Sequence, residues 1–216
     1  MKLRQDLTRF ECVAFEDTPW VPSPAPGIER KLLERDGAEV ARATSIVRYA
    51  PGCAFAEHGH ELGEEFVVLA GTFCDEHGCY PADSYVRNPP GSRHRPFSSD
   101  GCTIFVKLRQ FQLGDARRCV IALGASAQRQ RPREAATVTR LHEFENERVS
   151  LLQLSAGATL TLDVSVGVTE LFVLRGTLNI GTRPCHGWTW LRAAGQIPRL
   201  QAHAECAIWL RTRPRR

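Results

Sequence analysis

The stretch that decides the fold is Glu65-Phe66-Val67-Val68-Leu69-Ala70-Gly71, and it has a near-copy in Glu170-Leu171-Phe172-Val173-Leu174-Arg175-Gly176. Each run combines β-branched, aromatic and other apolar residues and ends on a glycine, which is typical of a strand followed by a turn. The turn glycines Gly52, Gly71 and Gly91 recur at nearly the same spacing as Gly157, Gly176 and Gly195. We infer an internal duplication.

Further short strands are predicted at 44–49, 102–108, 149–154, 160–166 and 206–210, separated by Gly and Pro turns. Only Ile28–Arg35 has a weak amphipathic helical pattern. Closely spaced short strands favour an all-β sandwich or barrel over alternating strands and helices. We therefore predict two tandem small β-barrels, over residues 1–124 and 135–216. The polar, arginine-rich residues 125–134 are the expected linker.

The composition is that of a globular protein, with 216 residues, 43% hydrophobic, 24% charged and a formal net charge of +4. No apolar run approaches the roughly 18 residues of a membrane-spanning helix. Because Met1–Asp6 lacks the apolar core of a secretory signal, we expect a cytoplasmic location. Arginines cluster at 129–133 and 211–216, but no stacking or groove-entering motif accompanies them, so nucleic-acid binding is not expected.

The eight cysteines are expected to be reduced thiols, because a chain of this length without a leader does not require a disulfide framework. Cys74 and Cys79 flank the segment Asp75-Glu76-His77-Gly78, whose turn-forming residues predict a hairpin tip. The alternative for these two cysteines is a reactive thiol pair.

Four side chains form a candidate metal site. His58 and His60 are two positions apart, so both point to one face of an extended strand. Glu64 follows a turn at Gly63, and His94 follows a later Pro- and Gly-containing turn. Three imidazoles and one carboxylate suit a single divalent ion of iron, manganese, nickel, cobalt or zinc. Each histidine alone would be interpreted as a surface residue beside a turn, but the joint pattern favours metal binding.

Two motifs resemble those of the cupin superfamily. Gly52-x5-His58-x-His60-x3-Glu64-x6-Gly71 resembles the first cupin motif, and Asp83-x5-Pro89-x-Gly91-x2-His94-x3-Ser98 resembles the second. The second departs from the usual motif at both ends, with Asp83 in place of Gly and Ser98 in place of Asn. The chain also contains Trp20-Val21-Pro22-Ser23-Pro24, Phe73-x-Asp75-Glu76-x-Gly78-x-Tyr80 and Tyr85-x-Arg87-Asn88-Pro89-Pro90-Gly91-Ser92-x-His94. With these segments, the stretch from Trp20 to about Leu108 resembles the ChrR-type cupin domain of anti-sigma factors. The resemblance implies a small β-barrel whose one metal is bound by His58, His60, Glu64 and His94.

The second copy departs from the motif at every ligand position. Alignment on the turn glycines puts Asp163, Ser165, Thr169 and Pro198 where the first copy has His58, His60, Glu64 and His94. We therefore expect a degenerate cupin without a metal site. Its tryptophans, Trp188, Trp190 and Trp209, are expected in the core or an interface.

Three functions remain open. The ChrR-type resemblance implies a regulatory or sensing protein that responds to an oxidant or a small ligand. A sigma-factor contact is doubtful, because fewer than 20 residues precede Trp20 and Cys12 stands alone where a His-x3-Cys-x2-Cys segment would be expected. The alternatives are a non-haem iron dioxygenase acting on a small diketone or aromatic ketone, and metal-dependent binding without turnover. Edge-strand pairing would give a homodimer.

Overall fold

The computed structural model describes residues 1–38, 40–124, 135–162 and 167–213. The elements whose bounds it gives are all strands, which confirms the all-β prediction. No helix in the described ranges has the length and hydrophobicity needed to cross a bilayer. The chain divides into two compact units, one of Met1–Gln5 with Thr18–Ala125 and one of Asp6–Asp17 with Ser126–Arg216.

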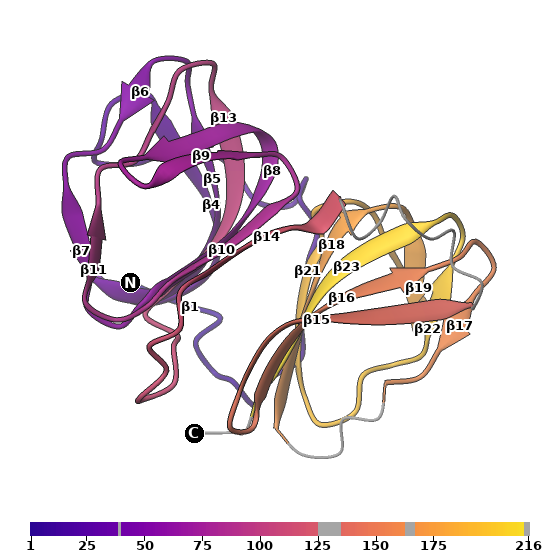
Figure 1. Ribbon diagram of the computed structural model, residues 1–216. Helices are drawn as coiled ribbons and strands as arrows, with labels where there is room; N and C mark the ends of the chain where they lie inside the picture. Colours follow the sequence, from indigo (N-terminus) through magenta and orange to yellow (C-terminus); the bar gives the residue numbers. More distant parts are fainter. Residues whose placement is uncertain (39, 125–134, 163–166, 214–216) are drawn as a thin grey trace. The chain divides into compact units, whose positions relative to one another are not determined.

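The first unit is built on one large antiparallel sheet. Its strands are β1 (Lys2–Leu3), β3 (Val21–Pro22), β4 (Ile28–Gly37), β5 (Ala41–Tyr49), β6 (Cys53–Ala54), β7 (His58–His60), β8 (Glu64–Asp75), β9 (Gly78–Pro81), β10 (Ser84–Asn88), β11 (Ser92–His94), β12 (Phe97–Ser98), β13 (Cys102–Leu108) and β14 (Cys119–Ala122). The main order is β1-β4-β5-β13-β8-β10-β14, and β7 and β11 form a separate two-stranded ribbon. Within this unit the ribbon lies across from the concave side of the large sheet (Figure 1).

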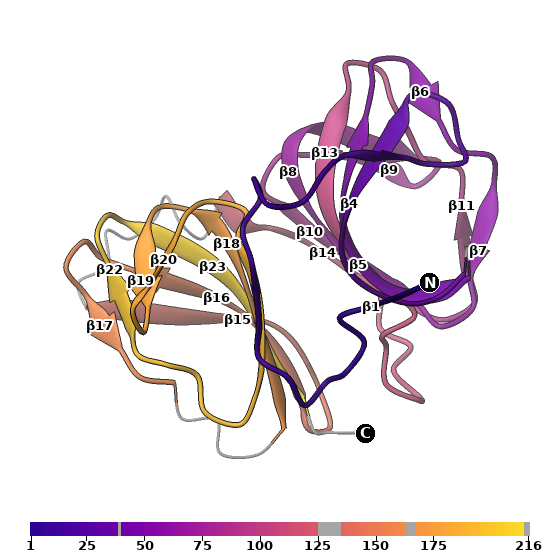
Figure 2. The same cartoon turned by 180° about the vertical axis from the view of Figure 1, so that it is seen from behind.

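The second unit has two antiparallel sheets. Its strands are β2 (Glu11–Val13), β15 (Ala136–Phe144), β16 (Glu147–Leu154), β17 (Thr159–Leu160), β18 (Val168–Arg175), β19 (Leu178–Ile180), β20 (Arg183–Cys185), β21 (Trp190–Ala194), β22 (Leu200–Ala202) and β23 (Cys206–Arg213). The six-stranded sheet has the order β15-β16-β23-β18-β21-β2, and the four-stranded sheet has the order β17-β22-β19-β20. Figure 2 shows this unit from behind.

The two units have the same strand order, as the duplication predicts. The series β4-β5-β13-β8-β10 in the first unit corresponds to β15-β16-β23-β18-β21 in the second. Both copies also carry a register shift at an equivalent place. In the pairing of β13 with β8, Leu69 of β8 is the extra residue, and in the pairing of β23 with β18, Leu174 of β18 is the extra residue. A bulge retained in both copies indicates a shared architecture, since bulges set the local twist of a sheet.

The segment Asp6–Asp17 joins the second unit, whereas Met1–Gln5 belongs to the first. β2 pairs with β21 through Glu11↔Arg192 and Val13↔Trp190, at the edge that β14 occupies beside β10 in the first unit. The expected boundary, residues 1–124 against 135–216, assigned this segment to the first copy. A three-residue strand is too short to reveal a distant partner by its periodicity. The expected linker, residues 125–134, lies outside the described residues.

Two local expectations were wrong. The weak helical pattern at Ile28–Arg35 belongs to β4, which pairs with β5 along its length from Ile28↔Tyr49 to Gly37↔Ala41. Tertiary pairing overrides a weak local preference of this kind. Of the strand expected at 160–166, Leu160 lies in β17 (Thr159–Leu160) and the next two residues are not in a strand; residues 163–166 lie outside the described ranges.

The expectation that all eight cysteines are reduced was wrong. Cys74 and Cys79 form a disulfide. They lie directly opposite each other on β8 and β9, and the predicted hairpin tip lies between them. This pairing follows from the hairpin register, which places the two side chains on the same face of neighbouring strands. Cys12, Cys53, Cys102, Cys119, Cys185 and Cys206 are free.

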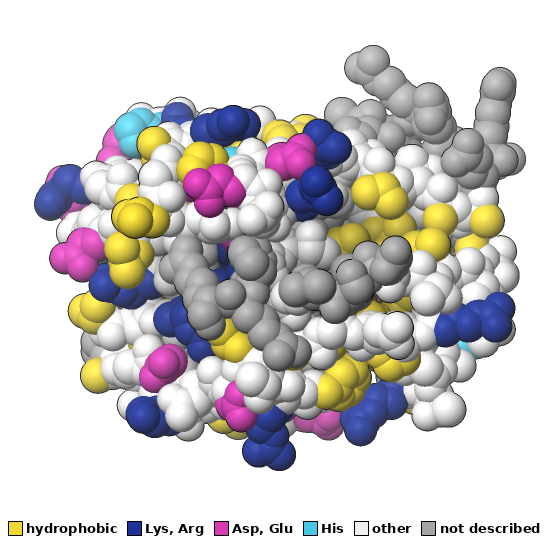
Figure 3. Space-filling model, turned by 90° about the horizontal axis from the view of Figure 1, so that it is seen from below, with side chains coloured by type: hydrophobic (Ala, Val, Ile, Leu, Met, Phe, Trp, Pro, Cys, Tyr) yellow, Lys and Arg dark blue, Asp and Glu magenta, His cyan; other side chains and the backbone are white. Residues whose placement is uncertain are grey.

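Each unit has its own core. The first is rich in aromatic residues, including Tyr49, Phe66, Phe73 and Tyr80. The second is mainly aliphatic, and Leu152, Leu171, Leu191 and Ile208 are among its members. Trp190 and Trp209 are fully buried, as predicted. Acidic and basic side chains are interspersed on the face drawn in Figure 3, and a surface of mixed sign does not by itself favour a polyanionic partner.

Candidate metal centre

Three histidines converge between β7 and β11. The antiparallel register places His94 directly opposite His58, and the strand alternation puts His60 on the same face as His58. The three ring centroids lie 4.8–5.0 Å from one another. His60 and His94 are 7% and 2% exposed, whereas His58 is half-buried. The ribbon thus aims three imidazoles at one point that is open mainly on the His58 side.

Glu64 joins this group because the chain turns back at Gly63. Gly63 has φ +77°, and a Cβ there would lie 2.4 Å from a ring carbon of Phe111, so the turn depends on glycine. Glu64 follows as the first residue of β8 and is 5% exposed. Its Oε2 lies 3.5 Å from Nε2 of His60 and 3.5 Å from Nε2 of His94. The carboxylate predicted from the spacing therefore faces the imidazoles.

The donor set fits one divalent cation. Nε2 of His60 lies 2.9 Å from Nε2 of His94, and ligand atoms of all three histidines lie within 4.8 Å of one another. Two ligands about 2.1 Å from a common ion are roughly 3.0 Å apart at a right angle and roughly 3.4 Å apart in a tetrahedron. Two imidazole lone pairs this close repel each other unless a proton or a cation lies between them. The spacing of the buried nitrogen and oxygen atoms is therefore that of a ligand set.

The orientation of His94 is fixed from behind by a carboxylate. Nδ1 of His94 lies 3.2 Å from Oδ2 of Asp75, so the ring donates its Nδ1 proton and keeps the Nε2 lone pair for a metal. Asp75 is itself held, because its Oδ1 accepts hydrogen bonds from the backbone amide of His77 at 2.9 Å and from the hydroxyl of Tyr80 at 3.2 Å. Carboxylate–histidine pairs of this type select the tautomer that binds metals.

Two further hydrogen bonds orient ligands. Nδ1 of His58 lies 2.9 Å from the carbonyl oxygen of Ala56, which can only accept, so the proton is on Nδ1 and Nε2 is free. Nδ2 of Asn88 donates to Oε2 of Glu64 at 3.0 Å, and Asn88 is buried on the neighbouring strand β10. The orientation of the carboxylate is thus fixed by a neutral donor that adds no competing charge.

Burial and neighbouring charges separate the pKa values of the two buried histidines. Burial lowers the pKa of His60. The charge of Glu64 acts to raise this pKa, but His94 and His58 act to lower it, and the net shift is downward. Burial also acts to lower the pKa of His94, but the hydrogen bond to Asp75 and the charges of Glu64 and Asp75 outweigh it, so that pKa is raised. Burial opposes ionisation of Asp75, yet its bonds with His94 and His77 lower its pKa. Without a metal, the exchangeable proton is therefore held more strongly at His94 than at His60.

Aromatic side chains surround the four residues. The ring of Phe55 packs edge-on against His58 at 5.7 Å, and the ring of Phe73 lies 6.0 Å from His94. Tyr49 contacts both phenylalanines, and burial together with the nearby charge of Glu64 raises the pKa of its hydroxyl well above the ordinary value. This apolar environment strengthens electrostatic interactions at the centre.

The two departures from the second cupin motif have local explanations. Asp83 adopts φ +67°, the left-handed conformation that the usual glycine would provide, and Asp tolerates it better than most residues do. Ser98 is fully buried, and its hydroxyl donates to the carbonyl oxygen of Thr72 at 2.6 Å. Both replacements keep the turn and the strand contact, and neither removes a candidate ligand.

Glu65, the next residue along β8, has a different role. Its side chain points to the face of the strand opposite Glu64. There it accepts a hydrogen bond from the hydroxyl of Tyr85 at 2.8 Å and forms an ion pair with Arg87. Arg87 is fully buried and also pairs with Asp115 at 2.6 Å. Two consecutive glutamates thus serve separate networks, one at the candidate metal centre and one behind the sheet.

The second unit offers different residues at the equivalent positions that can be described. Thr169 is buried in β18, and Pro198 supplies neither an imidazole nor a carboxylate. Asp163 and Ser165, the other two aligned positions, lie outside the described residues. The absence of a metal site in this unit therefore stays a prediction.

Sequence reasoning missed the residues that hold the ligands. Asp75 and Asn88 come from other strands, and their contacts with His94 and Glu64 span 19 and 24 residues of sequence. The only available signal was the position of Asp75 directly before the hairpin tip, which is typical of an ordinary turn residue. Distances across a sheet, and not spacing along the chain, reveal its second role.

Comparison with known proteins supports this architecture. Residues 8–112 match the ChrR cupin-like domain family. A search of curated proteins finds no significant match. A putative dioxygenase from Nostoc punctiforme superposes with a TM-score of 0.76 at 14% identity, covering 97% of this chain and 84% of that one. The nickel(II) complex of the pirin YhhW from Escherichia coli gives 0.72 at 13% identity, with 96% and 100% covered.

A salicylate 1,2-dioxygenase from Pseudaminobacter salicylatoxidans is also similar, with a TM-score of 0.65 at 9% identity, covering 97% of this chain and 85% of that one. Identities this low indicate a common fold and leave function open. The sequence match and the shared fold confirm the resemblance found in the two motifs. Residues 8–112 therefore belong to the ChrR cupin-like domain family.

Proposed function

We propose that this chain is a metal-dependent regulatory cupin that senses an oxidant or a small ligand. One divalent ion would be held by His58, His60, Glu64 and His94. The observation that carries the proposal is the convergence of three imidazoles with one buried carboxylate, whose Oε2 lies 3.5 Å from two of the ring nitrogens. The ion is one of iron, manganese, nickel, cobalt or zinc, which all accept nitrogen and oxygen ligands.

The chain supplies positioning and a dry environment. Asp75 sets the tautomer of His94, the carbonyl group of Ala56 sets that of His58, and Asn88 orients Glu64. A bound divalent ion would act as a Lewis acid with free positions for an external ligand. The partly exposed His58 side is where such a ligand would approach, because His60 and His94 are buried.

The regulatory assignment rests on the match of residues 8–112 to the ChrR cupin-like family. In this proposal, ligand or oxidant binding at the centre changes a contact with a partner protein. A sigma factor is one such partner. We place the protein in the cytoplasm, as expected from the sequence, and a homodimer formed through edge strands is compatible with the fold.

The alternative function is a non-haem iron dioxygenase acting on a small diketone or aromatic ketone. Two of the similar structures are described as a putative dioxygenase and a salicylate 1,2-dioxygenase. The packing of Phe55 and Phe73 around the histidines would also suit an apolar or aromatic substrate. Both functions use the same four ligands, so they differ in the consequence of ligand binding and not in the site.

The experiment that separates them combines metal analysis with oxygen uptake. Protein purified without a nickel column is analysed for bound metal, then loaded with Fe²⁺ and offered a panel of β-diketones and aromatic ketones. The regulatory proposal predicts one ion per chain and no substrate-dependent oxygen consumption. Uptake that disappears in His60→Ala would establish the enzyme instead. Protein that binds no divalent metal at all would overturn both functions.

A further inference from the structure

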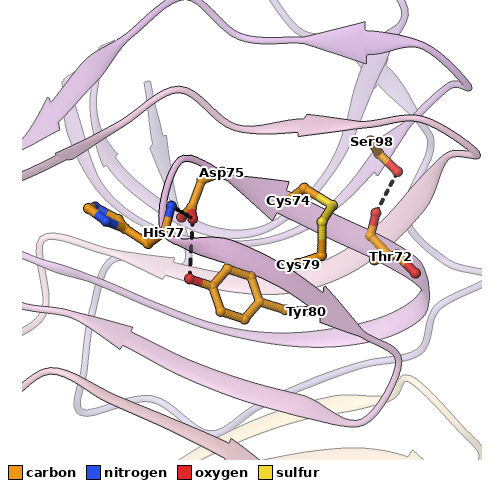
Figure 4. The surroundings of a disulfide bond; sticks show 7 residues. All are labelled: Thr72, Cys74, Asp75, His77, Cys79, Tyr80 and Ser98. Atoms are coloured by element: carbon orange, nitrogen blue, oxygen red, sulfur yellow. Dashed lines mark hydrogen bonds between the residues drawn. A yellow bond between two sulfur atoms is a disulfide. The ribbon is translucent and has the colours of Figure 1, made fainter.

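A disulfide lies next to the side chain that orients His94. Cys74 and Cys79 are directly opposite each other on β8 and β9. Asp75 follows Cys74 and Tyr80 follows Cys79, and the hydroxyl of Tyr80 donates to Oδ1 of Asp75 (Figure 4). The disulfide therefore clamps the two strand positions that immediately precede the members of this hydrogen bond.

The same hairpin is attached to the strand that carries His94. Besides the carboxylate–imidazole hydrogen bond described above, the backbone amide of Arg95 donates to Oε2 of Glu76 at 2.9 Å. Phe97 on β12 pairs with Cys74 itself. Three contacts thus join the β8–β9 hairpin to the residues from His94 to Phe97. A change in the hairpin reaches a metal ligand through contiguous bonds.

The two sulfur atoms differ in accessibility. Cys79 is exposed, whereas Cys74 is only 6% exposed. A dissolved thiol can therefore approach the sulfur of Cys79 more readily than that of Cys74. Thiol–disulfide exchange requires access along with a thiolate, so the reaction has a preferred entry point.

We propose that Cys74–Cys79 is a thiol–disulfide exchange site that sets the metal affinity of the His58–His60–Glu64–His94 centre. This inference rests on the proposed metal binding and adds a means of regulating it. The reagents are small thiols and the corresponding disulfides. The oxidised protein is the form with high metal affinity, and the reduced protein is the form with low affinity.

The exchange balances with two thiols. A small thiolate attacks the sulfur of Cys79, the Cys74–Cys79 bond breaks, and Cys74 leaves as a thiolate that takes up a proton. A second thiolate attacks the outer sulfur of the mixed disulfide on Cys79. The small disulfide is released, and Cys79 leaves as a thiolate that takes up a proton. Two small thiols are oxidised to one disulfide, and the protein disulfide is reduced to two thiols.

Reduction weakens metal binding through positioning. The crosslink limits the relative motion of the strand positions next to Asp75 and Tyr80, and Asp75 holds the ring of His94. Loss of an outer partner of a ligating histidine typically lowers metal affinity 10- to 100-fold, roughly. Because the hairpin keeps its backbone pairing after reduction, we expect the lower end, about tenfold. By linkage, the metal must favour the disulfide by the same factor.

The test is a Mn²⁺ titration of the full chain, with free Mn²⁺ measured by electron paramagnetic resonance. Manganese is chosen because thiolates bind it poorly, so the newly formed thiols do not imitate the site. Oxidised protein is compared with protein that has been reduced and freed of reductant under argon. The double variant Cys74→Ser/Cys79→Ser should bind with the low affinity of the reduced protein under both conditions. Asp75→Asn should bind weakly, with less than about a twofold difference between its redox states.

A second measurement tests the linkage directly. The fraction of reduced Cys74–Cys79 is followed in glutathione buffers by alkylation and mass spectrometry, with and without saturating Mn²⁺. The equilibrium constant should shift about tenfold toward the disulfide when the metal is bound. This wild-type experiment remains decisive if the double variant does not fold.

The outcomes distinguish the two proposals. Equal Mn²⁺ affinities in the two redox states, with no shift in the glutathione equilibrium, would overturn the coupling and leave the metal centre intact. A redox effect that persists fully in Asp75→Asn would also overturn the assigned route through His94. No Mn²⁺ binding in either state, together with no binding of Zn²⁺ or Fe²⁺ by the oxidised protein, would overturn both the metal centre and its regulation.

Discussion

Asp75 Oδ2 lies 3.2 Å from Nδ1 of His94, and this contact joins a hairpin tip to a candidate metal ligand. Both side chains are buried, at 6% and 2% exposure. The pair fixes which nitrogen of His94 faces His60 and Glu64. It also links proton binding, protein stability and metal binding at one place, because the same imidazole takes part in all three.

Removing a ligand should empty the centre. Wild-type protein is expected to hold one ion per chain, and Glu64→Gln should lower metal affinity by roughly 10-fold or more, because the anionic ligand is lost. His94→Ala should reduce bound metal below detection after dialysis. Elemental analysis measures both. The matched control is Thr169→Val, at the position aligned with Glu64 in the second unit, and it should leave the stoichiometry unchanged. Two ions per wild-type chain would contradict the degenerate second copy.

The metal-free protein should depend on pH through Asp75 and His94. The pKa of His94 is raised, so its contribution to stability is complete below the ordinary value of 6.5 and is lost as pH rises through the folded-state pKa. The pKa of Asp75 is lowered, so its contribution is present above the ordinary value of 3.8 and is lost as pH falls through the folded-state pKa. Asp75→Asn should therefore lower the free energy of unfolding most between pH 3.8 and pH 6.5, by about 1–2 kcal/mol.

Urea unfolding in the presence of a chelator, at several pH values between the two limits and above them, measures this cost. The difference between Asp75→Asn and wild type should shrink on the alkaline side. Metal loading should show the opposite trend and improve as pH rises, because the metal displaces the proton from the imidazole. A constant difference across the pH range would show that the pair is not charged in the metal-free protein.

Gly63→Ala should damage the turn that brings Glu64 to the histidines. A Cβ at this position combines a left-handed φ of +77° with a 2.4 Å approach to Phe111. We expect a loss of about 2 kcal/mol or more in the free energy of unfolding, along with weaker metal binding. Gly52→Ala is the control, because its φ is +75° but its Cβ would meet nothing within 4 Å. Equal losses in the two variants would show that the contact with Phe111 has no cost.

Cys12 should react faster with an alkylating reagent than Cys102 or Cys119. The hydrogen bond with Cys185 lowers the pKa of Cys12 to about 7, and the charge of Arg183 acts in the same direction against burial. Burial raises the pKa of Cys102 and of Cys119 to about 11. At pH 7.5, iodoacetamide should label Cys12 at least about tenfold faster than Cys119. Peptide mass spectrometry measures the rates, and Cys185→Ala should slow the labelling of Cys12. No slowing in that variant would contradict the role of Cys185.

The candidate ligands could be predicted from sequence because they lie on short local patterns. His58 and His60 alternate on one strand, and Glu64 follows one glycine turn later, so spacing alone places them together. His94 is more distant, and only its turn context suggested that it joins them. The pairing of β7 with β11 brings it opposite His58.

Other features could not be predicted in this way. β2 finds its partner β21 across nearly the whole chain, and a three-residue strand has too little periodicity to indicate it. Cys74 and Cys79 were expected to be reduced, because composition says nothing of the hairpin register that places them opposite each other. Asp75 looked like a turn residue, and its bond with His94 depends on how the hairpin lies against β11 and β12.

The sequence by itself determined the all-β class, the duplication and the four candidate ligands. The alternation of apolar and polar residues, the turn glycines and the motif spacing are local or repeated patterns, so they can be read from short segments of the sequence. Only the tertiary structure decided where the N-terminal segment pairs, that Cys74 and Cys79 meet as a disulfide, and that Asp75 holds His94. The pairing of β2 and the contact of Asp75 with His94 depend on strands that are not neighbours in sequence, and the disulfide depends on the exact register of one hairpin. Strand register is set by the packing of the whole sheet, so a short segment does not reveal it.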